Sequence, residues 1–412
     1  MFQSLVRSIK NEAHLFGAIA ANLRYGFPSK KLRMIGVTGT DGKTTTSHLI
    51  FHILKTAGKK VSITSSVHAD LAGEISDTGL HFTTENHWQV QKNLAQAMKQ
   101  GSEFFVLETT SHALHQHRVW GIPFEIAVLT NITPEHLDYH KTFDAYVRAK
   151  SKLLLNAKKV VINEDADVYE KVKSILDKAH KKYTTYSLRN TSAPTHWSDD
   201  IKTSLKETFN RENVLAAYAC CKELGLTDEE IRKGIRTFSL PKGRFDKVYD
   251  EDFTVYIDFA HTPHSISQLL SELKSPKKSL IHVFGSAGLR DSVKRPEMGK
   301  ASGSFADVSI ITEEDYRTED FMKITQMISA GLYEKGFSYL EPDVLKERSH
   351  DGKVFTIIKN RQKAIEFAIE YAQKGDVVVL TGKGHEQSLA RGLKEFPWDE
   401  YKTTEKAIQK RM

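Results

Sequence analysis

The chain has 412 residues, of which 40% are hydrophobic and 27% are charged, as in ordinary globular proteins. This length is sufficient for two or three domains, each with its own core. The formal net charge is +7, but the sequence contains no long basic block and no recognisable nucleic-acid-binding module. We therefore exclude nucleic acid as a partner and favour nucleotides and acidic metabolites.

The two cysteines and the N-terminus say little about chemistry. Cys220 and Cys221 are adjacent, which excludes a CxxC redox pair and predicts core packing in a reducing cytoplasm. No run reaches the roughly 18 apolar residues of a transmembrane segment. The apolar run Leu15 to Ala21 follows several charges and predicts a helix that packs on the protein or lies at a membrane surface, rather than an export signal.

From residue 31, short β-rich runs alternate with helical stretches. The first predicted strands are RMIGVTG, KVSITSS, EFFVLETT, EIAVLTNI and KVVINED, with helices at 44–57 and 86–99 between them. The polar segment 181–208 predicts short strands and turns at a sheet edge. Two helices should follow, at 213–224 and 227–236, the second opened by Thr227 and Asp228.

A second β/α series follows the Pro-Lys-Gly turn at 241–243. Its predicted strands are FTVYIDFA, SLIHVFGSA, DVSIITEE, KVFTIIKN and DVVVLTGKG, with a helix at 362–374. The alternation predicts an α/β protein with mostly parallel sheets. We expect a short N-terminal helical segment (1–30), a central domain (31–240) and a C-terminal Rossmann-like α/β domain (241–412).

The string MIGVTGTDGKTTTSHLI, residues 34–50, predicts a phosphate-binding loop. A strand, a glycine-rich turn and a helix that starts with lysine place backbone N–H groups around an anion. Lys43 can then reach the β and γ phosphates of ATP, and the hydroxyl of Thr44 or Thr45 can hold Mg²⁺. Gly39 and Gly42 supply turn conformations that a side chain would hinder. A purely structural strand-to-helix turn is the alternative.

This loop also resembles the T-G-T-N-G-K-T/S signature of the Mur ligase superfamily, with Asp41 in the usual asparagine position. The segment from VLETTSHAL to TNITPEHLDYH and YVRAK is similar to its UDP-N-acetylmuramoyl-tripeptide synthetase (MurE-type) branch. GRF at 243, DFAHTPHSI at 258, FGSAGLRDSVKRPEMG at 284 and TGKGHE at 381 extend the resemblance over roughly residues 33–390.

The resemblance implies ATP and Mg²⁺ as cofactors and assigns roles to individual residues. Glu108, which ends a predicted strand, suits Mg²⁺ on physical grounds, with a buried structural acid as the alternative. Lys150 would by default lie on a solvated helix face, but the family has a carbamylated lysine at this position. Implied catalytic residues are Lys43, Glu108, His136 and Lys150, and implied metal ligands are Thr44, Glu108, His136 and carbamylated Lys150. Implied ATP-binding residues are Gly39, Thr40, Asp41, Gly42, Lys43, Thr44, Thr45, Asn210, Asn213, Arg244 and Asp258.

Two further sets of residues match the substrate contacts of the family. Thr83, Thr84, Ser111 and Arg118 match residues that meet the muramoyl-peptide acceptor, although TTEN here replaces the usual T-T-P. Arg290, Asp315, Arg317, Gly382 and Glu386 match contacts to the incoming amino acid.

The string EDYR, residues 314–317, stands where the diaminopimelate-adding branch has D-N-P-R. Arg317 favours an amino acid with a second carboxylate, and Asp315 beside Glu313 and Glu314 favours a distal ammonium group. A solvated strand end is the alternative explanation of these acids. We therefore expect meso-diaminopimelate as the substrate, with lysine or ornithine as the alternative.

Together the motifs imply a cytoplasmic, monomeric ATP-dependent amide ligase of peptidoglycan precursor synthesis. It would form an acyl phosphate on a UDP-N-acetylmuramoyl-L-alanyl-D-glutamate-like acid and release ADP and phosphate. About 30 residues precede the first strand, so we expect the usual UDP-binding domain of the family to be missing. A non-UDP acceptor, as in folylpolyglutamate or cyanophycin synthetases, and a non-catalytic ATP-binding scaffold are the alternatives.

Overall fold

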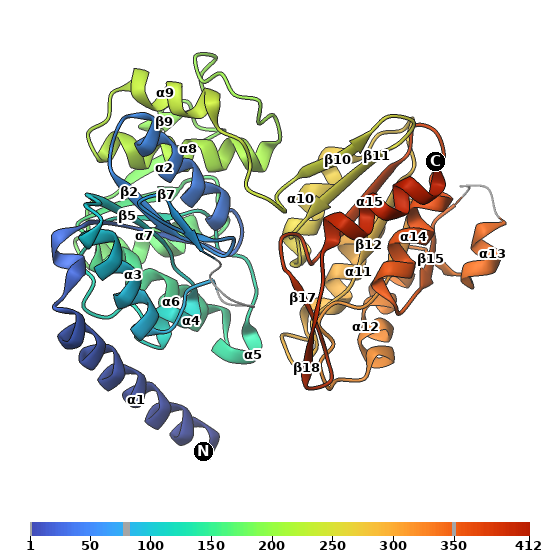
Figure 1. Ribbon diagram of the computed structural model, residues 1–412, viewed down its shortest axis with the longest axis horizontal. Helices are drawn as coiled ribbons and strands as arrows, with labels where there is room; N and C mark the ends of the chain where they lie inside the picture. The colour runs from blue at the N-terminus through green and yellow to red at the C-terminus, as the bar shows by residue number, and fades with distance from the viewer. Residues whose placement is uncertain (1, 77–82, 348–351) are drawn as a thin grey trace. The chain divides into compact units, whose positions relative to one another are not determined.

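The computed structural model describes residues 2–76, 83–347 and 352–412, with the backbone alone described for residues 2–10. The chain forms two compact units; Figure 1 draws the first from blue to green and the second, apart from residues 135–141, from yellow to red. The first takes the chain up to Pro134 and Thr142–Pro241, and the second takes Glu135–Lys141 and Lys242–Met412. No described helix is both long enough and apolar enough to cross a membrane.

The described strands of the first unit form one nine-stranded sheet in the order β4-β3-β2-β5-β1-β6-β7-β8-β9. All neighbouring strands from β2 to β9 are parallel, whereas β3 and β4 extend the sheet as antiparallel strands. The strands are β1 (Arg33–Thr38), β2 (Val61–Thr64), β3 (Ala69–Leu71), β4 (Glu74–Ser76), β5 (Phe104–Glu108), β6 (Phe124–Leu129), β7 (Lys159–Asn163), β8 (Thr184–Ser187) and β9 (Thr195–His196).

Helices cover both faces of this sheet because its central strands are apolar on both sides. In β1, Ile35 and Val37 pack in the core with α2, α8 and α9, whereas Met34 packs in the core with α3, α6 and α7. Strands buried on both faces are typical of parallel sheets. The helices are α1 (Phe2–Tyr25), the 3₁₀ helix η1 (Pro28–Lys31), α2 (Lys43–Thr56), α3 (His87–Lys99), α4 (Ser111–His115), α6 (Phe143–Asn156), α7 (Tyr169–Lys178), α8 (Thr208–Glu223) and α9 (Asp228–Thr237).

The described strands of the second unit form a seven-stranded sheet, β10-β11-β16-β12-β13-β15-β14, and a separate hairpin, β17-β18. Only β10 is antiparallel to its neighbour within the seven-stranded sheet. The strands are β10 (Asp246–Asp250), β11 (Thr254–Asp258), β12 (Leu280–Phe284), β13 (Val308–Ile311), β14 (Ser338–Tyr339), β15 (Val354–Ile357), β16 (Val377–Thr381), β17 (Ser388–Arg391) and β18 (Lys394–Pro397).

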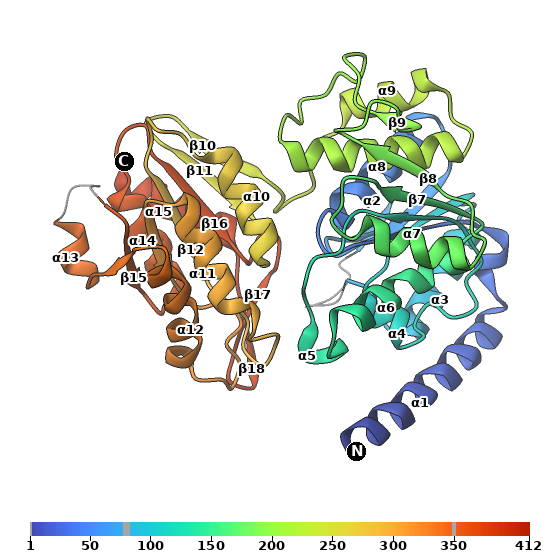
Figure 2. The same ribbon diagram turned by 180° about the vertical axis from the view of Figure 1, so that it is seen from behind.

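Two helical layers also enclose this second sheet, as the turned view in Figure 2 shows. Core side chains of α14 and α15 pack on one face, and those of α10, α11 and α12 pack on the other. The helices are α5 (Leu137–His140), α10 (Pro263–Leu273), α11 (Lys294–Phe305), α12 (Phe321–Glu334), α13 (Pro342–Lys346), α14 (Arg361–Tyr371) and α15 (Glu400–Arg411).

The predicted fold class, α/β with mostly parallel sheets, is confirmed, and Cys220 and Cys221 are fully buried. Two local predictions were incomplete. Helix α8 begins at Thr208, five residues before the predicted start, and the short strands β3, β4, β10, β14, β17 and β18 were not predicted.

Candidate active site

The loop between β1 and α2 needs glycine at two positions because neighbouring side chains approach its backbone closely. A Cβ atom at Gly39 would lie 1.8 Å from the hydroxyl oxygen of Thr130. At Gly42, where φ is +79°, a Cβ atom would lie 2.3 Å from Oδ1 of Asn213. The loop is therefore packed from two sides, by the end of β6 and by α8.

Asn131, which follows β6, fixes the turn of the loop. Its carbonyl oxygen accepts the N–H of Thr40 at 2.9 Å, and its side-chain Oδ1 accepts the N–H of Asp41 at 2.9 Å. The hydroxyl of Thr130 donates to the carbonyl of Asp41 at 2.6 Å. This Thr-Asn pair opens the string TNITPEHLDYH, but no role was predicted for either residue.

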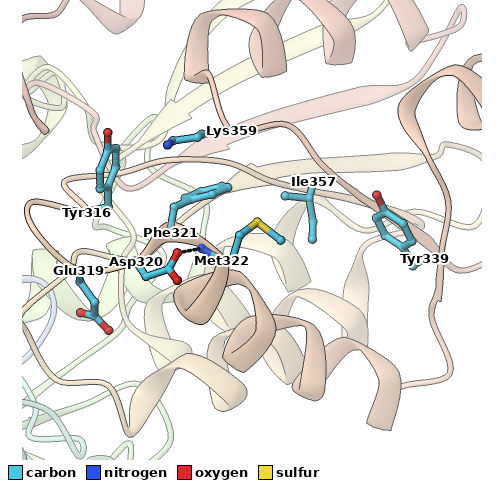
Figure 3. Close-up of a pocket in the computed structure, with 8 residues that line it drawn as sticks. All are labelled: Tyr316, Glu319, Asp320, Phe321, Met322, Tyr339, Ile357 and Lys359. Atoms are coloured by element: carbon cyan, nitrogen blue, oxygen red, sulfur yellow. Dashed lines mark hydrogen bonds between the residues drawn. The ribbon is translucent and has the colours of Figure 1, made fainter.

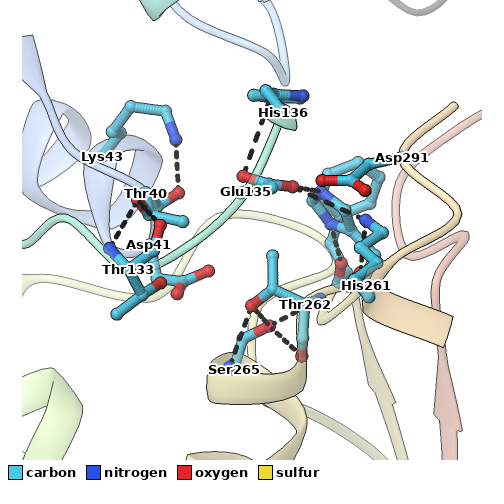
Figure 4. Close-up of polar contacts among 12 residues, drawn as sticks. Thr40, Asp41, Lys43, Thr133, Glu135, His136, His261, Thr262, Ser265 and Asp291 are labelled. Atoms are coloured by element: carbon cyan, nitrogen blue, oxygen red, sulfur yellow. Dashed lines mark hydrogen bonds and ion pairs between the residues drawn. The ribbon is translucent and has the colours of Figure 1, made fainter. Parts of the chain in front are cut away.

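Lys43 opens α2, where backbone N–H groups and the helix dipole favour a bound anion. Its ammonium group donates to the carbonyl of Thr40 at 2.7 Å, so the side chain folds over the loop (Figure 4). Thr44 and Thr45 follow in the first turn of the helix and are buried. These residues bring one cation, two hydroxyls and a helix N-terminus to one loop.

Glu108 ends β5, next to β1, with a side chain that is 1% exposed. Its carboxylate accepts the Thr44 hydroxyl at 3.0 Å and both the N–H and the hydroxyl of Ser66 at 3.0 Å. A carboxylate among hydroxyl oxygens suits Mg²⁺, which prefers oxygen ligands and keeps several of its waters. No group of three or more His, Cys, Asp or Glu side chains poised for a metal occurs among the described residues.

Lys150, on α6, is not on a solvated helix face, since its side chain is only 2% exposed. Its Nζ atom donates to the carbonyl of Gly39 at 2.5 Å and lies 4.7 Å from the ring centre of Tyr146. The default expectation from composition is therefore wrong. The helix turns this lysine inward, against the phosphate-binding loop.

The predicted acceptor residues lie around the C-terminal end of β5. Thr84 donates to the carbonyl of Glu108 at 2.9 Å and accepts the N–H of Thr110 at 3.0 Å. Arg118 donates to the carbonyl of Thr84 at 2.6 Å, and Ser111 is buried in the first turn of α4. Thr83, half-buried, precedes this group in the chain.

Asn210 and Asn213 are both buried on α8. Asn213 accepts the hydroxyl of Thr46 at 3.2 Å in addition to its approach to Gly42, whereas Asn210 donates to Glu207 at 2.8 Å. Asn213 thus contacts the phosphate-binding loop and its helix, and Asn210 contacts its own helix start.

Glu212 lies between Asn210 and Asn213 on α8 and allows a test of protein stability that does not depend on enzymatic activity. Burial raises the pKa of Glu212 to about 7, the Asp165 charge adds to this, and Arg189 opposes it. Because this pKa is above that of the unfolded chain, ionisation destabilises the fold progressively from about pH 4.5 to above pH 7. We expect Glu212→Gln to raise the free energy of unfolding by about 1–2 kcal/mol at pH 8 and to change it little at pH 4.5. Urea unfolding at the two pH values measures this.

The matched control for Glu212→Gln is Glu229→Gln, which makes the same change at an exposed position on α9. Because Glu229 lies in the first turn of α9, where a carboxylate interacts favourably with the helix dipole, this control should raise the stability at neither pH value. An equal gain in both variants, or a gain of Glu212→Gln at pH 4.5, would contradict the explanation by burial.

Arg244 and Asp258 lie together in the second unit. Asp258 accepts the N–H groups of Phe245 and Ala260, each at 2.6 Å, and so shapes the turn after β11. Burial raises the pKa of Asp258, while the Arg244 guanidinium opposes this rise. Arg244 lies over the ring of Phe259, 4.7 Å from its centre.

His136 is accompanied by a buried acid for which no role was predicted, Glu135 (Figure 4). Glu135 forms ion pairs with His136 at 3.6 Å, with His261 at 3.4 Å and with Lys294 at 3.6 Å. Burial alone would raise the pKa of Glu135, but these three groups hold it well below its usual range. The only sequence signal was the position of Glu135 directly before His136 in the string TNITPEHLDYH.

The predicted amino-acid contacts also gather within the second unit. Arg317 has a positive φ of +52° and donates to the carbonyl of Gly288 at 2.9 Å. Partial burial and the like charge of Arg317 lower the pKa of Arg290, which indicates that the two guanidinium groups lie near each other. Such a pair of cations suits a carboxylate.

Asp315 and Glu386 are linked by Lys383, a fully buried lysine that was not predicted as a site residue. Its ammonium donates to Asp315 at 3.0 Å and to Glu386 at 2.5 Å. Burial alone would lower the pKa of Lys383, yet these two acids keep it raised.

The acidic run 313–315 is not a solvated strand end, because all three side chains are buried. Glu313 pairs with Arg391 at 2.6 Å, and Asp315 pairs with Lys383. Burial raises the pKa of Glu314, which lies beside Gly382. Two of the three charges are therefore already compensated inside the protein.

Tyr316, which replaces the proline of the family motif, lines an open pocket of about 490 Å³ with Phe321 and Lys359 (Figure 3). The Lys359 ammonium lies 5.0 Å from the ring centre of Tyr316. None of the predicted site residues lines this pocket. The tyrosine ring is thus accommodated in this pocket.

Known protein families match both halves of the chain. Residues 37–221 match the Mur ligase middle domain, and residues 243–384 match the Mur ligase, glutamate ligase domain. A UDP-N-acetylmuramoyl-L-alanyl-D-glutamate–2,6-diaminopimelate ligase of Trichormus variabilis is 35% identical over 99% of this chain and 83% of its own length. A UDP-N-acetylmuramyl-tripeptide synthetase of Deinococcus radiodurans is 36% identical over 93% of this chain and 79% of its own.

Two solved structures are similar to the chain. The structure of a UDP-N-acetylmuramoyl-L-alanyl-D-glutamate–2,6-diaminopimelate ligase is 30% identical, with a TM-score of 0.57, and covers 92% of this chain and 79% of its own. A folylpolyglutamate synthase of Mycobacterium tuberculosis, complexed with ADP and AMPPCP, is 18% identical with a TM-score of 0.67 over 89% of this chain and 92% of its own, which shows a shared fold. The extent of the matches and the order of the motifs lead to one conclusion: the chain belongs to the Mur ligase family.

Proposed function

We propose that this protein is an ATP-dependent ligase that adds meso-diaminopimelate to a UDP-N-acetylmuramoyl-L-alanyl-D-glutamate-like acid, in the cytoplasm, during peptidoglycan precursor synthesis. The observation that carries this proposal is the cluster of Lys43, Thr44, Glu108 and Lys150 around one phosphate-binding loop. The named functions of the relatives support the choice of both substrates.

The proposed reaction begins when the acceptor carboxylate attacks the γ-phosphorus of ATP, forming an acyl phosphate and releasing ADP. The first turn of α2 binds the phosphates, and Lys43 moves from the Thr40 carbonyl to neutralise the charge that spreads over the transferred group. Thr44 and Glu108 would hold Mg²⁺, with His136 and Lys150 as further ligands. Bound there, Mg²⁺ supplies positive charge to the triphosphate.

In the second step the amino group attacks the acyl carbon, and phosphate leaves as the amide forms. Thr83, Thr84, Ser111 and Arg118 are proposed to hold the acceptor, with Arg118 as the cation for its carboxylates. Asn210, Asn213, Arg244 and Asp258 are assigned to ATP, together with the loop residues Gly39, Thr40, Asp41, Gly42 and Thr45. Arg290, Asp315, Arg317, Gly382 and Glu386 are assigned to the amino acid.

The test of this function is acceptor-dependent release of phosphate from ATP. We expect turnover only when the UDP-muramoyl-dipeptide and diaminopimelate are both present, with one amide formed per phosphate. Turnover with a folate or another acid in place of the muramoyl-peptide would identify a different acceptor. Turnover that never depends on an acceptor and an amino acid together would reject a ligase.

Lys150 is proposed to carry a carbamate, which would turn its buried cation into a carboxylate. We expect Lys150→Ala to lose activity and to regain part of it in acetate or formate, because these anions can occupy the space left by the side chain. The same salts should not restore Lys43→Ala. Intact-mass analysis that finds an unmodified Lys150 in fully active enzyme would contradict the carbamate.

Arg317→Ala tests the choice of amino acid. We expect the KM for diaminopimelate to rise about 100-fold, because a charge-assisted contact to its distal carboxylate is lost. The KM for lysine, which has no such carboxylate, should change little. Kinetic measurements with both amino acids decide this.

Lys359→Ala is the control for Arg317→Ala. It removes a cation beside Tyr316, in the pocket of Figure 3, that is not assigned to the substrate. An equal rise in KM for lysine and diaminopimelate in Arg317→Ala, or the same rise in the control, would contradict the assignment and leave lysine or ornithine as the better substrate.

A further inference from the structure

Helix α1 has one face that is fixed to the first unit. Ala18, Ala21 and Asn22 are buried, and α1 packs along α3. The amide of Asn22 donates to the carbonyl of Trp120 at 3.0 Å. A Cβ atom at Gly17 would lie only 2.4 Å from the ring of His87 on α3. This close approach determines which face of α1 is turned away from the unit.

The outward face of α1 is apolar and exposed. Phe16 and Leu23 are 71% and 66% exposed, and Ala13 and Ala20 are exposed beside them. These four residues follow a helical spacing of three, four and three positions, so they form one line along the helix. We call them the α1 stripe.

The sequence pattern of the α1 stripe extends toward the N-terminus, and α1 itself extends beyond the rest of the first unit. The same spacing runs back through Ile9, Leu5 and Phe2. Both views of the molecule show the N-terminal part of α1 extending beyond the other elements of the first unit (Figures 1 and 2). The exposed part of this line, from Ala13 to Leu23, indicates an interaction site on a surface helix.

The charges around α1 indicate what this site binds. The first 31 residues contain five lysines and arginines and a single acid, Glu12. The whole chain has a net charge of +7, so most of its positive excess lies in and just after this helix. An apolar line beside clustered cations is typical of helices that lie in the interface of an anionic bilayer.

We propose that the α1 stripe docks on the surface of an anionic lipid bilayer. Phe16 and Leu23 enter the region between headgroups and acyl chains, while the neighbouring lysines and arginines pair with lipid phosphates. A second copy of the chain is the less favourable partner, because pairing two α1 stripes would bring two sets of like charges together. Docking would hold the ligase at a membrane without a spanning helix.

Co-sedimentation of the full chain with vesicles tests this proposal. We expect binding to phosphatidylcholine vesicles that contain about 30% phosphatidylglycerol, weak binding to phosphatidylcholine alone, and a loss of binding as the salt concentration rises. The variant Phe16→Glu/Leu23→Glu should lower the ratio of bound to free protein at least about tenfold, because both apolar anchors are lost.

The matched control is Ile75→Glu/Leu393→Glu, which adds the same two charges at apolar residues that are 70% and 95% exposed elsewhere. It should retain most of the binding. Far-ultraviolet circular dichroism and thermal unfolding establish that both variants keep the fold.

Three outcomes would overturn the proposal. The first is a native chain that does not bind anionic vesicles at low salt. The second is an equal loss of binding in the control, which would make net charge the sole cause. The third is a native dimer, seen by sedimentation equilibrium, that Phe16→Glu/Leu23→Glu converts to a monomer, since the α1 stripe would then bind a second copy.

Discussion

Replacing Lys43 by alanine should lower kcat/KM for ATP in the ligase reaction by about a thousandfold. The substitution removes the one side-chain cation at the start of α2, and a charge aimed at the developing negative charge is worth about 3–4 kcal/mol in a dry site. The hydrogen bond from Lys43 to the Thr40 carbonyl at 2.7 Å already places this cation over the loop. Steady-state kinetics with coupled detection of ADP measures the loss.

The control is Lys55→Ala in the last turn of the same helix. Lys55 is 59% exposed, and it forms a long ion pair with Asp70, at 3.6 Å, and lies 5.2 Å from the ring centre of Phe51. This variant should retain its activity within about twofold, because exposed pairs contribute little. If Lys43→Ala and Lys55→Ala lost similar activity, the effect would belong to the stability of α2 and the phosphate-binding role would be wrong.

The second large effect is expected at the buried ion pair between Arg361 and Glu400. Both side chains are 0% exposed, and they are joined by two hydrogen bonds, of 2.5 and 2.9 Å. Arg361→Met leaves the Glu400 carboxylate buried without its counter-ion, so it should lower the free energy of unfolding of the second unit by about 3–5 kcal/mol. Hydrogen exchange of the β16 amides in the full chain reports this loss.

A double variant separates the cost of an unpaired buried charge from the cost of lost hydrogen bonds. Arg361→Met/Glu400→Leu removes both charges and should lose only about 1–3 kcal/mol, because the carbonyl of Thr381 and the indole of Trp398 lose one partner each. Lys346→Met is the control, since Lys346 forms an exposed pair with Glu370. A double variant less stable than Arg361→Met would mean that hydrogen bonds, rather than charge burial, dominate this site.

The strong periodic elements of the fold could be predicted from sequence because their signal is local. The five strands predicted in each half are apolar runs bounded by turns, and all of them are present. β14, with only Ser338 and Tyr339, forms by pairing with β15, so nothing in its own sequence marks it. The start of α8 at Thr208 was missed because its first turns are polar.

The residues of the candidate site also fall into those that could be predicted from sequence and those that could not. Residues within long motifs could be found by resemblance, and the structure brings Thr44 and Glu108 together as oxygen donors. Ser66 could not be found, because its importance depends on Glu108, far away in the chain. Lys383 stands within the TGKGHE string, but nothing in that string indicates its ion pair with the distant Asp315. Sequence also gave no sign that Lys150 is buried, since a lysine on a charged helix is ordinarily solvated.

The internal pairs around residues 313–315 have an evolutionary consequence. Because Lys383 joins Asp315 to Glu386, a mutation of any one of the three leaves a buried charge unbalanced. Substitutions here should therefore be epistatic, each tolerated only with a compensating change at a second position. A shift in amino-acid preference would then require paired mutations, and descendants of this ligase should keep or exchange these residues as a set.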